Sequence, residues 1–343
     1  MPIKMKSIIS LLPWAVLAFS LESQIPITSP SKPLSLDAIP LLGFGTWNLK
    51  EKNTSEAVSW AIQTGYRHID CAAIYGNEAE VGRGIADGLL KTGLTREDLW
   101  ITSKLWNDKH DMNQVESGID ETLQKLGVGY LDLYHMHWPV AFSMFGKKSI
   151  SYTETWASMA LLLQKNKTRH IGVSNFSPYQ IQNLINGTGV KPSVHQMELH
   201  PYLQQQEFVD WHQKNGIHVT AYSPLGGTNP TYDEGEGPTP LLKSKTVKKI
   251  AKKRDCTPAQ VILQWGMSRG TSVIPKSIHK DHITENFHAP ECGLKKKDLK
   301  KLEKLGKERK RYNNPSESWG LDLYEGLEDA DGKGGKAKGE QCV

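Results

Sequence analysis

The sequence predicts a single α/β domain folded as a closed (β/α)8 barrel of the TIM type. Between residues 41 and 287, short apolar runs alternate with longer amphipathic segments eight times. Strands that alternate with helices form parallel sheets, and eight uninterrupted repeats favour a closed barrel over a doubly wound sheet. The 343 residues also accommodate one barrel of about 250 residues with extensions. The composition, 38% hydrophobic and 23% charged, is that of an ordinary globular protein.

The apolar runs predict the strands, and the amphipathic segments predict the helices. The strands are expected at residues 41–45, 67–70, 99–104, 130–137, 170–173, 194–198, 217–221 and 272–274. The helices are expected at residues 55–64, 78–90, 115–126, 156–164, 178–185, 205–214, 258–268 and 281–287. In the third helix, from Val115 to Leu126, apolar residues recur with the 3.6-residue period of one helical face. Thr257 and Pro258 give the helix at 258–268 an N-cap and a first-turn proline.

Three segments depart from the plain repeat. Residues 246–254 predict an extra helix before the seventh barrel helix, and residues 222–240 form a long loop rich in glycine, proline and acidic residues. A tail over residues 312–326 is expected to lie over the barrel mouth. Long loops at the carboxyl-terminal face of a barrel usually serve the site, so we expect these segments to shape a pocket.

Gly82, Gly84 and Gly88 approximate the glycine pattern of dinucleotide-binding loops. They lie inside a predicted helix and follow no strand directly, which is the wrong context for such a loop. We therefore predict that these glycines serve helix–barrel packing. The sequence contains neither a phosphate loop nor a metal-binding cluster, so no metal is expected.

The N-terminus has the layout of a secretory signal peptide. Two lysines precede an apolar run over residues 8–19, and Ala18-Phe19-Ser20 resembles a cleavage site. The run is too short to span a bilayer comfortably, so no membrane insertion of the mature chain is expected. The predicted plan is a signal peptide at 1–20, a linker at 21–32, the barrel domain at 33–326 and a disordered tail at 327–343. The alternative is a cytoplasmic enzyme with a disordered or weakly packed extension.

Cysteines, sequons and charge give further expectations. The spacings of the four cysteines, at positions 71, 256, 292 and 342, match no zinc pattern and no dense disulfide framework. We therefore expect mostly free thiols, with Cys71 as a small core side chain. Sequons, relevant only in the secretory pathway, begin at residues 53, 166, 175 and 186. The net charge of +5 is too small to favour a nucleic-acid partner. Residues 295–311 predict an amphipathic surface helix with a basic face, and contact with an anion or a membrane surface is the alternative.

Four side chains at the carboxyl-terminal ends of consecutive strands predict carbonyl reduction. Asp70, Lys104 and His137 end the second, third and fourth strands, and Tyr75 follows Asp70 in the next loop. Each residue alone is as well explained by a cap, by packing or by surface exposure. Barrel enzymes place their catalytic groups at these strand ends, so together the four side chains would face one mouth.

Hydride addition to a carbonyl leaves negative charge on oxygen, which needs a proton and stabilisation. We expect Tyr75 to be the acid, with its pKa lowered by the ammonium of Lys104. Asp70 would supply the counter-charge to Lys104, and His137 would orient the carbonyl oxygen through a hydrogen bond.

Several motifs resemble those of the aldo-keto reductases, closest to the glycerol-, aldose- and alcohol-reductase-like members. They include GFGTW at 43–47, GYRHIDCAAIYGNEAEVG at 65–82, ITSKLW at 101–106, LDLYHMHWP at 131–139, IGVSNF at 171–176, HQMELHPY at 195–202, YSPLG at 222–226 and IPKS at 274–277. The resemblance runs in family order from about residue 33 to 320. It implies an NADP-dependent, monomeric oxidoreductase that interconverts small aldehydes or ketones and alcohols or polyols.

The resemblance also implies the cofactor and substrate residues. The matching cofactor positions are Thr46, Trp47, Ser174, Asn175, Gln196, Tyr222, Ser223, Leu225, Lys276, Ser277, His282, Glu285 and Asn286. Ser174, Asn175 and Gln196 would hold the carboxamide, Tyr222 would stack on the nicotinamide, and Ser223 and Leu225 match the pyrophosphate loop. Lys276 and Ser277 match the 2′-phosphate site. The substrate pocket would be formed by Trp47, Trp106, His137 and Trp138.

Two positions depart from the family pattern. His282 stands where the family usually has an arginine on the 2′-phosphate, so NADPH stays favoured but NADH use is expected as well. His195 replaces the usual asparagine before Gln196 and is expected to alter the floor under it. An intact set of four catalytic residues favours an enzyme, and a catalytically silent nucleotide-binding barrel is the alternative.

Overall fold

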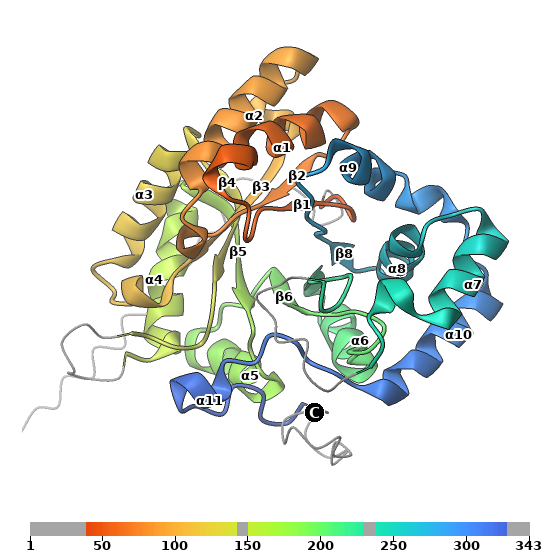
Figure 1. Cartoon of the computed structure of the whole chain (residues 1–343). Helices are drawn as coiled ribbons and strands as arrows, with labels where there is room; N and C mark the ends of the chain where they lie inside the picture. Colours follow the sequence, from red (N-terminus) through yellow and green to blue (C-terminus); the bar gives the residue numbers. More distant parts are fainter. Residues whose placement is uncertain (1–38, 143–149, 229–237, 328–343) are drawn as a thin grey trace, which may run out of the picture. The chain divides into compact units, whose positions relative to one another are not determined.

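The computed structural model describes residues 39–142, 150–228 and 238–327 (Figure 1). The predicted signal peptide and linker, and all but the first residue of the predicted disordered tail, lie outside these residues. Eight parallel strands pair in chain order. They are β1 Phe44–Gly45, β2 His68–Asp70, β3 Trp100–Leu105, β4 Leu131–Met136, β5 Thr168–Ser174, β6 Val194–Glu198, β7 His218–Tyr222 and β8 Ser272–Val273. The predicted parallel sheet of eight strands is therefore confirmed.

The barrel closes between its first and last strands. An isolated parallel bridge joins Leu42 to Val273, and the backbone amide of Gly45 donates to the carbonyl of Pro275 at 3.0 Å. A Cβ atom at Gly45 would lie 2.8 Å from the carbonyl oxygen of Ile274, so only glycine permits this approach. Both strands at the seam are two residues long, shorter than predicted, because this bridge and single hydrogen bonds replace a continuous ladder there.

Helices surround the strands, as Figure 1 shows. They are α1 Glu51–Thr64, α2 Glu78–Thr92, α3 Val115–Leu126, α4 Tyr152–Gln164, α5 Pro178–Thr188, α6 Gln206–Lys214, α7 Lys245–Arg254, α8 Pro258–Met267, α9 Lys280–Phe287, α10 Lys296–Glu303 and α11 Ser316–Trp319. The predicted extra helix is α7, which packs on α8. Every predicted helix is present, with ends that differ by a few residues. The main apolar core joins buried strand residues to the inner faces of the helices.

The three glycines of α2 pack against neighbouring helices. A Cβ atom at Gly82 would lie 2.5 Å from the carbonyl oxygen of Leu126 in α3, and one at Gly84 would lie equally close to that of Ser55 in α1. Gly88 meets Ile62 of α1 in the same way. The prediction of helix–barrel packing is thus corrected to helix–helix packing, which explains why the run needs no ligand.

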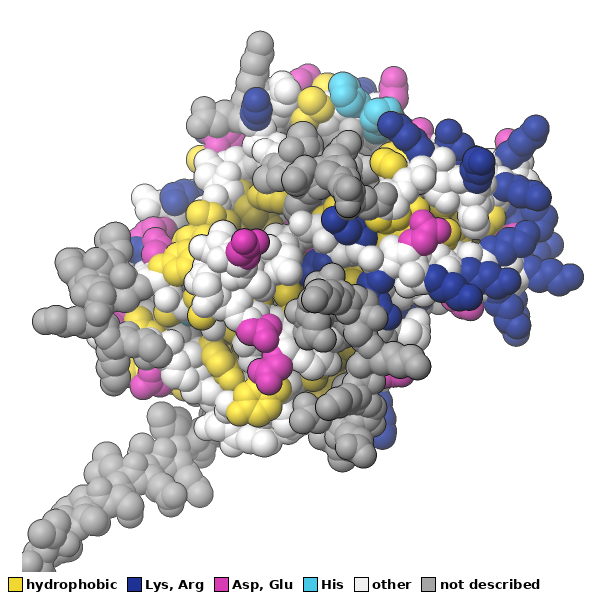
Figure 2. All heavy atoms as spheres, turned by 60° about the horizontal axis from the view of Figure 1, so that its bottom comes forward, with side chains coloured by type: hydrophobic (Ala, Val, Ile, Leu, Met, Phe, Trp, Pro, Cys, Tyr) yellow, Lys and Arg dark blue, Asp and Glu magenta, His cyan; other side chains and the backbone are white. Residues whose placement is uncertain are grey.

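Lysine and arginine side chains gather over α7 and α10, on the right of the molecule in Figure 2. The apolar side of α10 packs into a second core cluster through Leu299 and Leu302, and Leu305 extends it. Exposed lysines occupy the opposite face, including Lys296 and Lys300. The amphipathic helix predicted from residues 295–311 is confirmed for its first half, and the segment beyond Glu303 continues as a 3-10 turn.

The expectation of mostly free thiols is wrong for two of the four cysteines. Cys256 and Cys292 form a disulfide across 36 residues of sequence. Cys256 precedes α8, and Cys292 ends a 3-10 helix, η6 (Ala289–Cys292), that packs against α8. Spacing could not predict the pair because tertiary packing brings the two residues together. Cys71 is free and buried, as expected.

Candidate active site

A cavity of about 760 Å³ lies over the carboxyl-terminal ends of the strands. The predicted site residues that line it are Thr46, Trp47, Asp70, Tyr75, Trp106, His137, Trp138, Asn175, Gln196, Tyr222, Ser223, Leu225, Lys276, Ser277, His282, Glu285 and Asn286. Lys104 and Ser174 are not among its lining residues, and both are buried. Short parallel strands that end at one face of the barrel explain this convergence, because each strand delivers its next side chain to the same mouth.

Lys104 links the proposed acid to its counter-charge. Its Nζ donates to Oδ1 of Asp70 at 2.5 Å, to the carbonyl of Cys71 at 2.8 Å and to the hydroxyl oxygen of Tyr75 at 3.1 Å. Tyr75 ends a short 3-10 helix, η2 (Ala73–Tyr75), which turns its side chain back over the end of β2. All three donor positions of the ammonium are therefore used, and its direction is fixed.

Burial sets the protonation states of this pair. The burial of Lys104 lowers its pKa, but Asp70 and Tyr75 together raise the pKa by more than burial lowers it. The net shift is therefore upward, and the ammonium keeps its proton. Burial raises the pKa of Tyr75, Lys104 lowers it by less, and the result is about 12. Lys104 lowers this pKa, as expected, but desolvation outweighs its charge, so the net shift is upward and not downward. Tyr75 is thus held as a neutral phenol beside the ammonium of Lys104.

His137 is a neutral imidazole beside Tyr75. Burial, and then the charge of Lys104, lower its pKa well below its ordinary range. Its ring lies edge-on to Tyr75 and Trp106, with centroid distances of 5.8 and 5.2 Å. Among the described residues, Nδ1 of His137 has no hydrogen-bond partner. A neutral ring that lines the cavity can donate one N–H to a carbonyl oxygen there.

Two side-chain amides are fixed next to these groups. Nε2 of Gln196 donates to Oδ2 of Asp70 at 2.7 Å. Nδ2 of Asn175 donates to the carbonyl of His137 at 3.1 Å, and its Oδ1 accepts from the hydroxyl of Tyr222 at 2.7 Å. Asn175 adopts a left-handed backbone with φ of 63°, which asparagine tolerates better than most residues. Both amides thus have one orientation, which is what the alignment of a planar ligand amide requires.

The structure shows the contacts of His195, and its effect on the floor under Gln196 stays a prediction. Nδ1 of His212 lies 2.5 Å from the carbonyl of Phe208, and its Nε2 lies 2.8 Å from Nδ1 of His195. A carbonyl can only accept, so His195 donates to His212 and its own Nε2 accepts the backbone N–H of Phe176 at 3.2 Å. His195 therefore holds the backbone that follows Asn175.

An aromatic wall forms the other side of the cavity. Trp319 of α11 packs edge-on against Trp138, Phe142 and Trp106, with centroid distances of 5.0, 5.2 and 6.5 Å. Trp319 and its neighbour Asn313, which donates to the Tyr222 hydroxyl at 3.2 Å, line the cavity but were not among the predicted site residues. Apolar residues in the tail, among them Trp319, Leu323 and Tyr324, were the signal that could have indicated this contact. The tail predicted to cover the mouth does so through these residues.

The far end of the cavity lies between β8, α8 and α9. Lys276 and Ser277 follow β8, and His282 and Glu285 come from α9. Lys276 is partly buried, which lowers its pKa, and it makes no ion pair with any residue the structure describes. Thr257 was predicted only as the N-cap of a helix. It also lines this end of the cavity, and its hydroxyl donates to Oε1 of Glu285 at 2.7 Å.

Neither a metal site nor a membrane-spanning helix is present among the described residues. They contain no group of three or more metal-ligating side chains that could hold an ion. No helix in them is both long and apolar enough to cross a bilayer. At one end of the cavity the lining includes the phenol of Tyr75 and the imidazole of His137, with the buried ammonium of Lys104 behind them, and at the other end it includes Lys276.

Comparisons with known proteins agree with this geometry. Residues 41–307 match the model of the aldo/keto reductase family. An oxidoreductase of Schizosaccharomyces pombe is 44% identical over 308 residues, which cover 85% of this chain and 92% of the relative. A D/L-glyceraldehyde reductase of Hypocrea jecorina is 41% identical over 310 residues, with coverage of 83% and 91%.

Solved structures give the same result. A Bombyx mori aldo-keto reductase in complex with NADP superposes with a TM-score of 0.78 at 35% identity, over 83% of this chain and 95% of that one. The aldose reductase of Giardia lamblia also gives a TM-score of 0.78 at 35% identity, over 86% of this chain and 100% of that one. These solved structures thus confirm the barrel fold that the sequence predicts.

Proposed function

This chain belongs to the aldo/keto reductase family, and we propose that it reduces small aldehydes and ketones to alcohols with NADPH, using Tyr75 as the proton donor. One observation carries the proposal: Lys104 is buried between Asp70 and Tyr75 at the end of a cavity of about 760 Å³. This arrangement keeps a phenol protonated and stabilises its anion, which reduction of a carbonyl needs and which simple binding does not.

The cavity suits a phosphorylated dinucleotide. At one end Asn175 and Gln196 present oriented amides for a carboxamide, beside the ring of Tyr222. At the other end Lys276 is a partly buried cation without an acidic partner in the described chain, which is costly unless an anion is bound there. When bound, NADPH would supply the hydride that reduces the carbonyl carbon.

The residues of the chain then have distinct roles. His137 donates a hydrogen bond to the carbonyl oxygen and holds it near Tyr75. The Tyr75 hydroxyl gives its proton to that oxygen as charge develops on it, and Lys104 stabilises the resulting phenolate. Asp70 keeps Lys104 charged and in place. The same groups run in reverse for the oxidation of an alcohol or polyol.

We also propose that NADPH is preferred and that NADH is used more weakly. Lys276 and Ser277 support a 2′-phosphate, but His282 is exposed and lacks the planar, permanently charged fork of arginine. For substrates, the names of the relatives point to small aldehydes such as glyceraldehyde and to sugars. The aromatic wall of Trp106, Trp138 and Trp319 suits a small substrate with an apolar face.

The test is NADPH consumption with a panel of aldehydes that includes glyceraldehyde, with NADH in parallel. We expect turnover with both cofactors and a lower KM for NADPH. Tight NADPH binding without turnover of any aldehyde would instead support a silent nucleotide-binding barrel.

We propose that the chain acts as a monomer in the secretory pathway. The disulfide between Cys256 and Cys292 supports an oxidising compartment, and the sequon residues Asn166 and Asn186 are exposed. An endoglycosidase that lowers the mass of the protein from its native host would support this location. A chain that keeps its N-terminus and carries no sugar would indicate the cytoplasm. Light scattering would test the monomer.

A further inference from the structure

The disulfide encloses one functional part of the cavity. The chain between Cys256 and Cys292 contains α8, β8 and α9. Ten residues that line the cavity lie within it, among them Thr257, Lys276, Ser277, His282 and Glu285. The residues of the catalytic end, such as Tyr75, His137 and Gln196, lie outside it. The bridge therefore closes a loop around one half of the proposed cofactor site.

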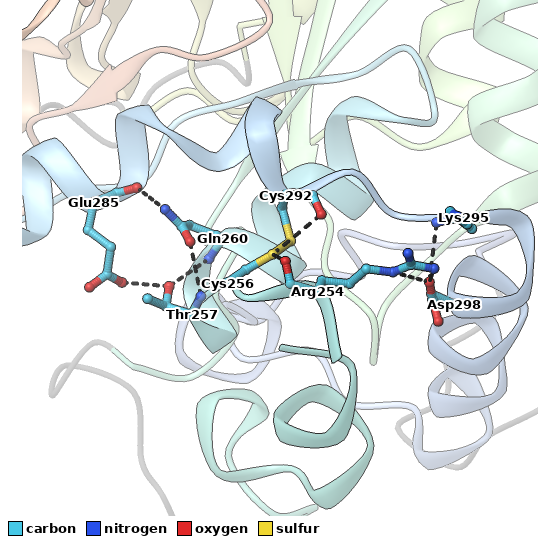
Figure 3. Close-up of a disulfide and its surroundings, with 8 residues drawn as sticks. All are labelled: Arg254, Cys256, Thr257, Gln260, Glu285, Cys292, Lys295 and Asp298. Atoms are coloured by element: carbon cyan, nitrogen blue, oxygen red, sulfur yellow. Dashed lines mark hydrogen bonds and ion pairs between the residues drawn. A yellow bond between two sulfur atoms is a disulfide. The ribbon is translucent and has the colours of Figure 1, made fainter. Parts of the chain in front are cut away.

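Hydrogen bonds connect the residues that follow Cys256 to Glu285, as Figure 3 shows. Thr257 follows Cys256 directly, and its hydroxyl donates to the carboxylate of Glu285 at 2.7 Å. The amide of Gln260 joins the same two residues: its Oε1 accepts from the backbone N–H of Thr257 at 3.0 Å, and its Nε2 donates to the carbonyl of Glu285 at 2.8 Å. Two of these hydrogen bonds join the start of α8 to Glu285 of α9, and the third, between Thr257 and Gln260, lies within the start of α8.

The second cysteine fixes the other side of this joint. Cys292 ends the 3-10 helix that follows α9, and it is buried against α8 in the second core cluster. Without the bridge, the end of α9 would be held to α8 by packing and by these hydrogen bonds alone, and its side chains face solvent on one side. A segment that must become ordered when a ligand binds loses affinity, and a covalent constraint removes that cost.

We infer that the Cys256–Cys292 disulfide, acting through Thr257 and Glu285, positions the adenosine-binding half of the site and makes affinity for the nucleotide dependent on the redox state of the bridge. This inference rests on the proposed function. Reduction by a dithiol breaks the bond between the two Sγ atoms. The dithiol gives two electrons and two protons, leaves two cysteine thiols and is itself oxidised to a disulfide. Cys256 is partly exposed, so a small dithiol can reach the bridge.

The test is calorimetric titration of the full chain with adenosine 2′,5′-bisphosphate, which carries only the adenosine half, and with NADPH. Titrations are made before and after dithiothreitol treatment, with thiol counting to show that the bridge is open. We expect Kd to rise roughly fivefold for both probes on reduction, which is about the cost of ordering one long side chain. KM for NADPH should rise with it, and kcat should stay the same, because the catalytic end lies outside the loop.

Two variants separate this role from a general loss of structure. Cys256→Ser/Cys292→Ser should bind like the reduced protein and should not respond to dithiothreitol, which excludes effects at other thiols. Thr257→Val keeps the bridge and the shape of the side chain but removes both the bond to Glu285 and the cap bond from the backbone N–H of Gln260, and it should also weaken binding of the bisphosphate. Circular dichroism at the assay temperature shows that each variant is folded.

Equal Kd values for oxidised and reduced protein would overturn the inference and leave the proposed function standing. A fall in kcat of the same size as the rise in KM would also overturn it, since that pattern indicates a general disturbance. Failure of NADPH to bind in either redox state would instead contradict the proposed function itself.

Discussion

The two ends of the cavity are built in opposite ways. At the catalytic end, Lys104 binds Asp70 from 34 residues away, and Gln196 binds the same carboxylate from 126 residues away. At the far end, which we propose binds the adenosine half of the cofactor and call the adenosine end, ten lining residues come from one stretch closed by a disulfide of 36-residue separation. The catalytic end is buried and depends on the whole barrel, whereas the adenosine end is local and partly exposed. The comparison teaches that the buried group of Asp70, Lys104 and Gln196 is fixed by distant parts of the fold, while the wall around Lys276 is built locally.

The largest effect should come from breaking the buried pair at the catalytic end. Lys104→Met removes the charge that stabilises the Tyr75 anion, so kcat should fall by roughly 10²–10³. It also leaves the Asp70 carboxylate buried without a cation, which should cost about 3 kcal/mol of unfolding free energy. Turnover and denaturant unfolding measure the two effects. Lys104→Met/Asp70→Leu should regain stability but no activity, and recovery of activity in the double variant would contradict the role given to Lys104.

The second largest effect should be a loss of stability in acid, caused by histidines that are buried behind the catalytic end. Burial lowers the pKa of His212 to about 4, below that of a histidine in the unfolded chain. Between these two pKa values the unfolded chain binds a proton at His212 and the folded chain does not. Stability is therefore lost as the pH falls from about 6.5 towards 4. His212 alone accounts for up to about 3 kcal/mol of this loss. Thermal unfolding at several pH values measures it.

Two variants, one of a buried histidine and one of an exposed histidine, test whether burial causes the loss of stability in acid. His212→Gln keeps a hydrogen-bonding side chain that does not titrate, so its acid loss should be smaller. His282→Asn changes an exposed histidine at the adenosine end and should leave the pH dependence unchanged. Equal curves for all three proteins would remove the contrast between buried and exposed histidines.

A smaller effect is expected at the aromatic wall. Trp319→Ala removes a ring that contacts Trp138 at a centroid distance of 5.0 Å. KM for an aromatic aldehyde such as benzaldehyde should rise about tenfold, because the substrate loses apolar contact. KM for glyceraldehyde should change less, since a small polar substrate gains little from apolar contact with the ring. A parallel rise for both substrates would indicate that Trp319 supports the fold of the tail instead.

The smallest effect should come from the adenosine end. His282→Arg introduces a planar cation near Lys276, so the preference for NADPH over NADH should increase about three- to tenfold. Competing kcat/KM values for the two cofactors measure it. His282→Gln is the matched neutral control and should leave the ratio near that of the wild type. If His282→Arg raises kcat/KM for NADH as much as for NADPH, the arginine does not recognise a 2′-phosphate.

Periodicity and strand-end residues predicted most of the fold and much of the site. The order of strands, the extra helix α7 and the convergence of Asp70, Tyr75 and His137 follow from local patterns and from the geometry of parallel barrels. The disulfide, the helix contacts of Gly82 and the role of Trp319 do not, because each depends on which surfaces pack together. The pKa of Tyr75 was misjudged for a related reason, since a charge is visible in the sequence and burial is not.

The claim that Tyr75 is the proton donor is tested most directly by Tyr75→Phe, with turnover and NADPH binding measured on the same preparation. The variant loses the hydroxyl that accepts from Lys104 at 3.1 Å and keeps the ring. We predict that kcat for glyceraldehyde falls by roughly 10²–10⁴ while Kd for NADPH stays within about twofold. Near-normal turnover by Tyr75→Phe would contradict the account, because another group would then have to supply the proton.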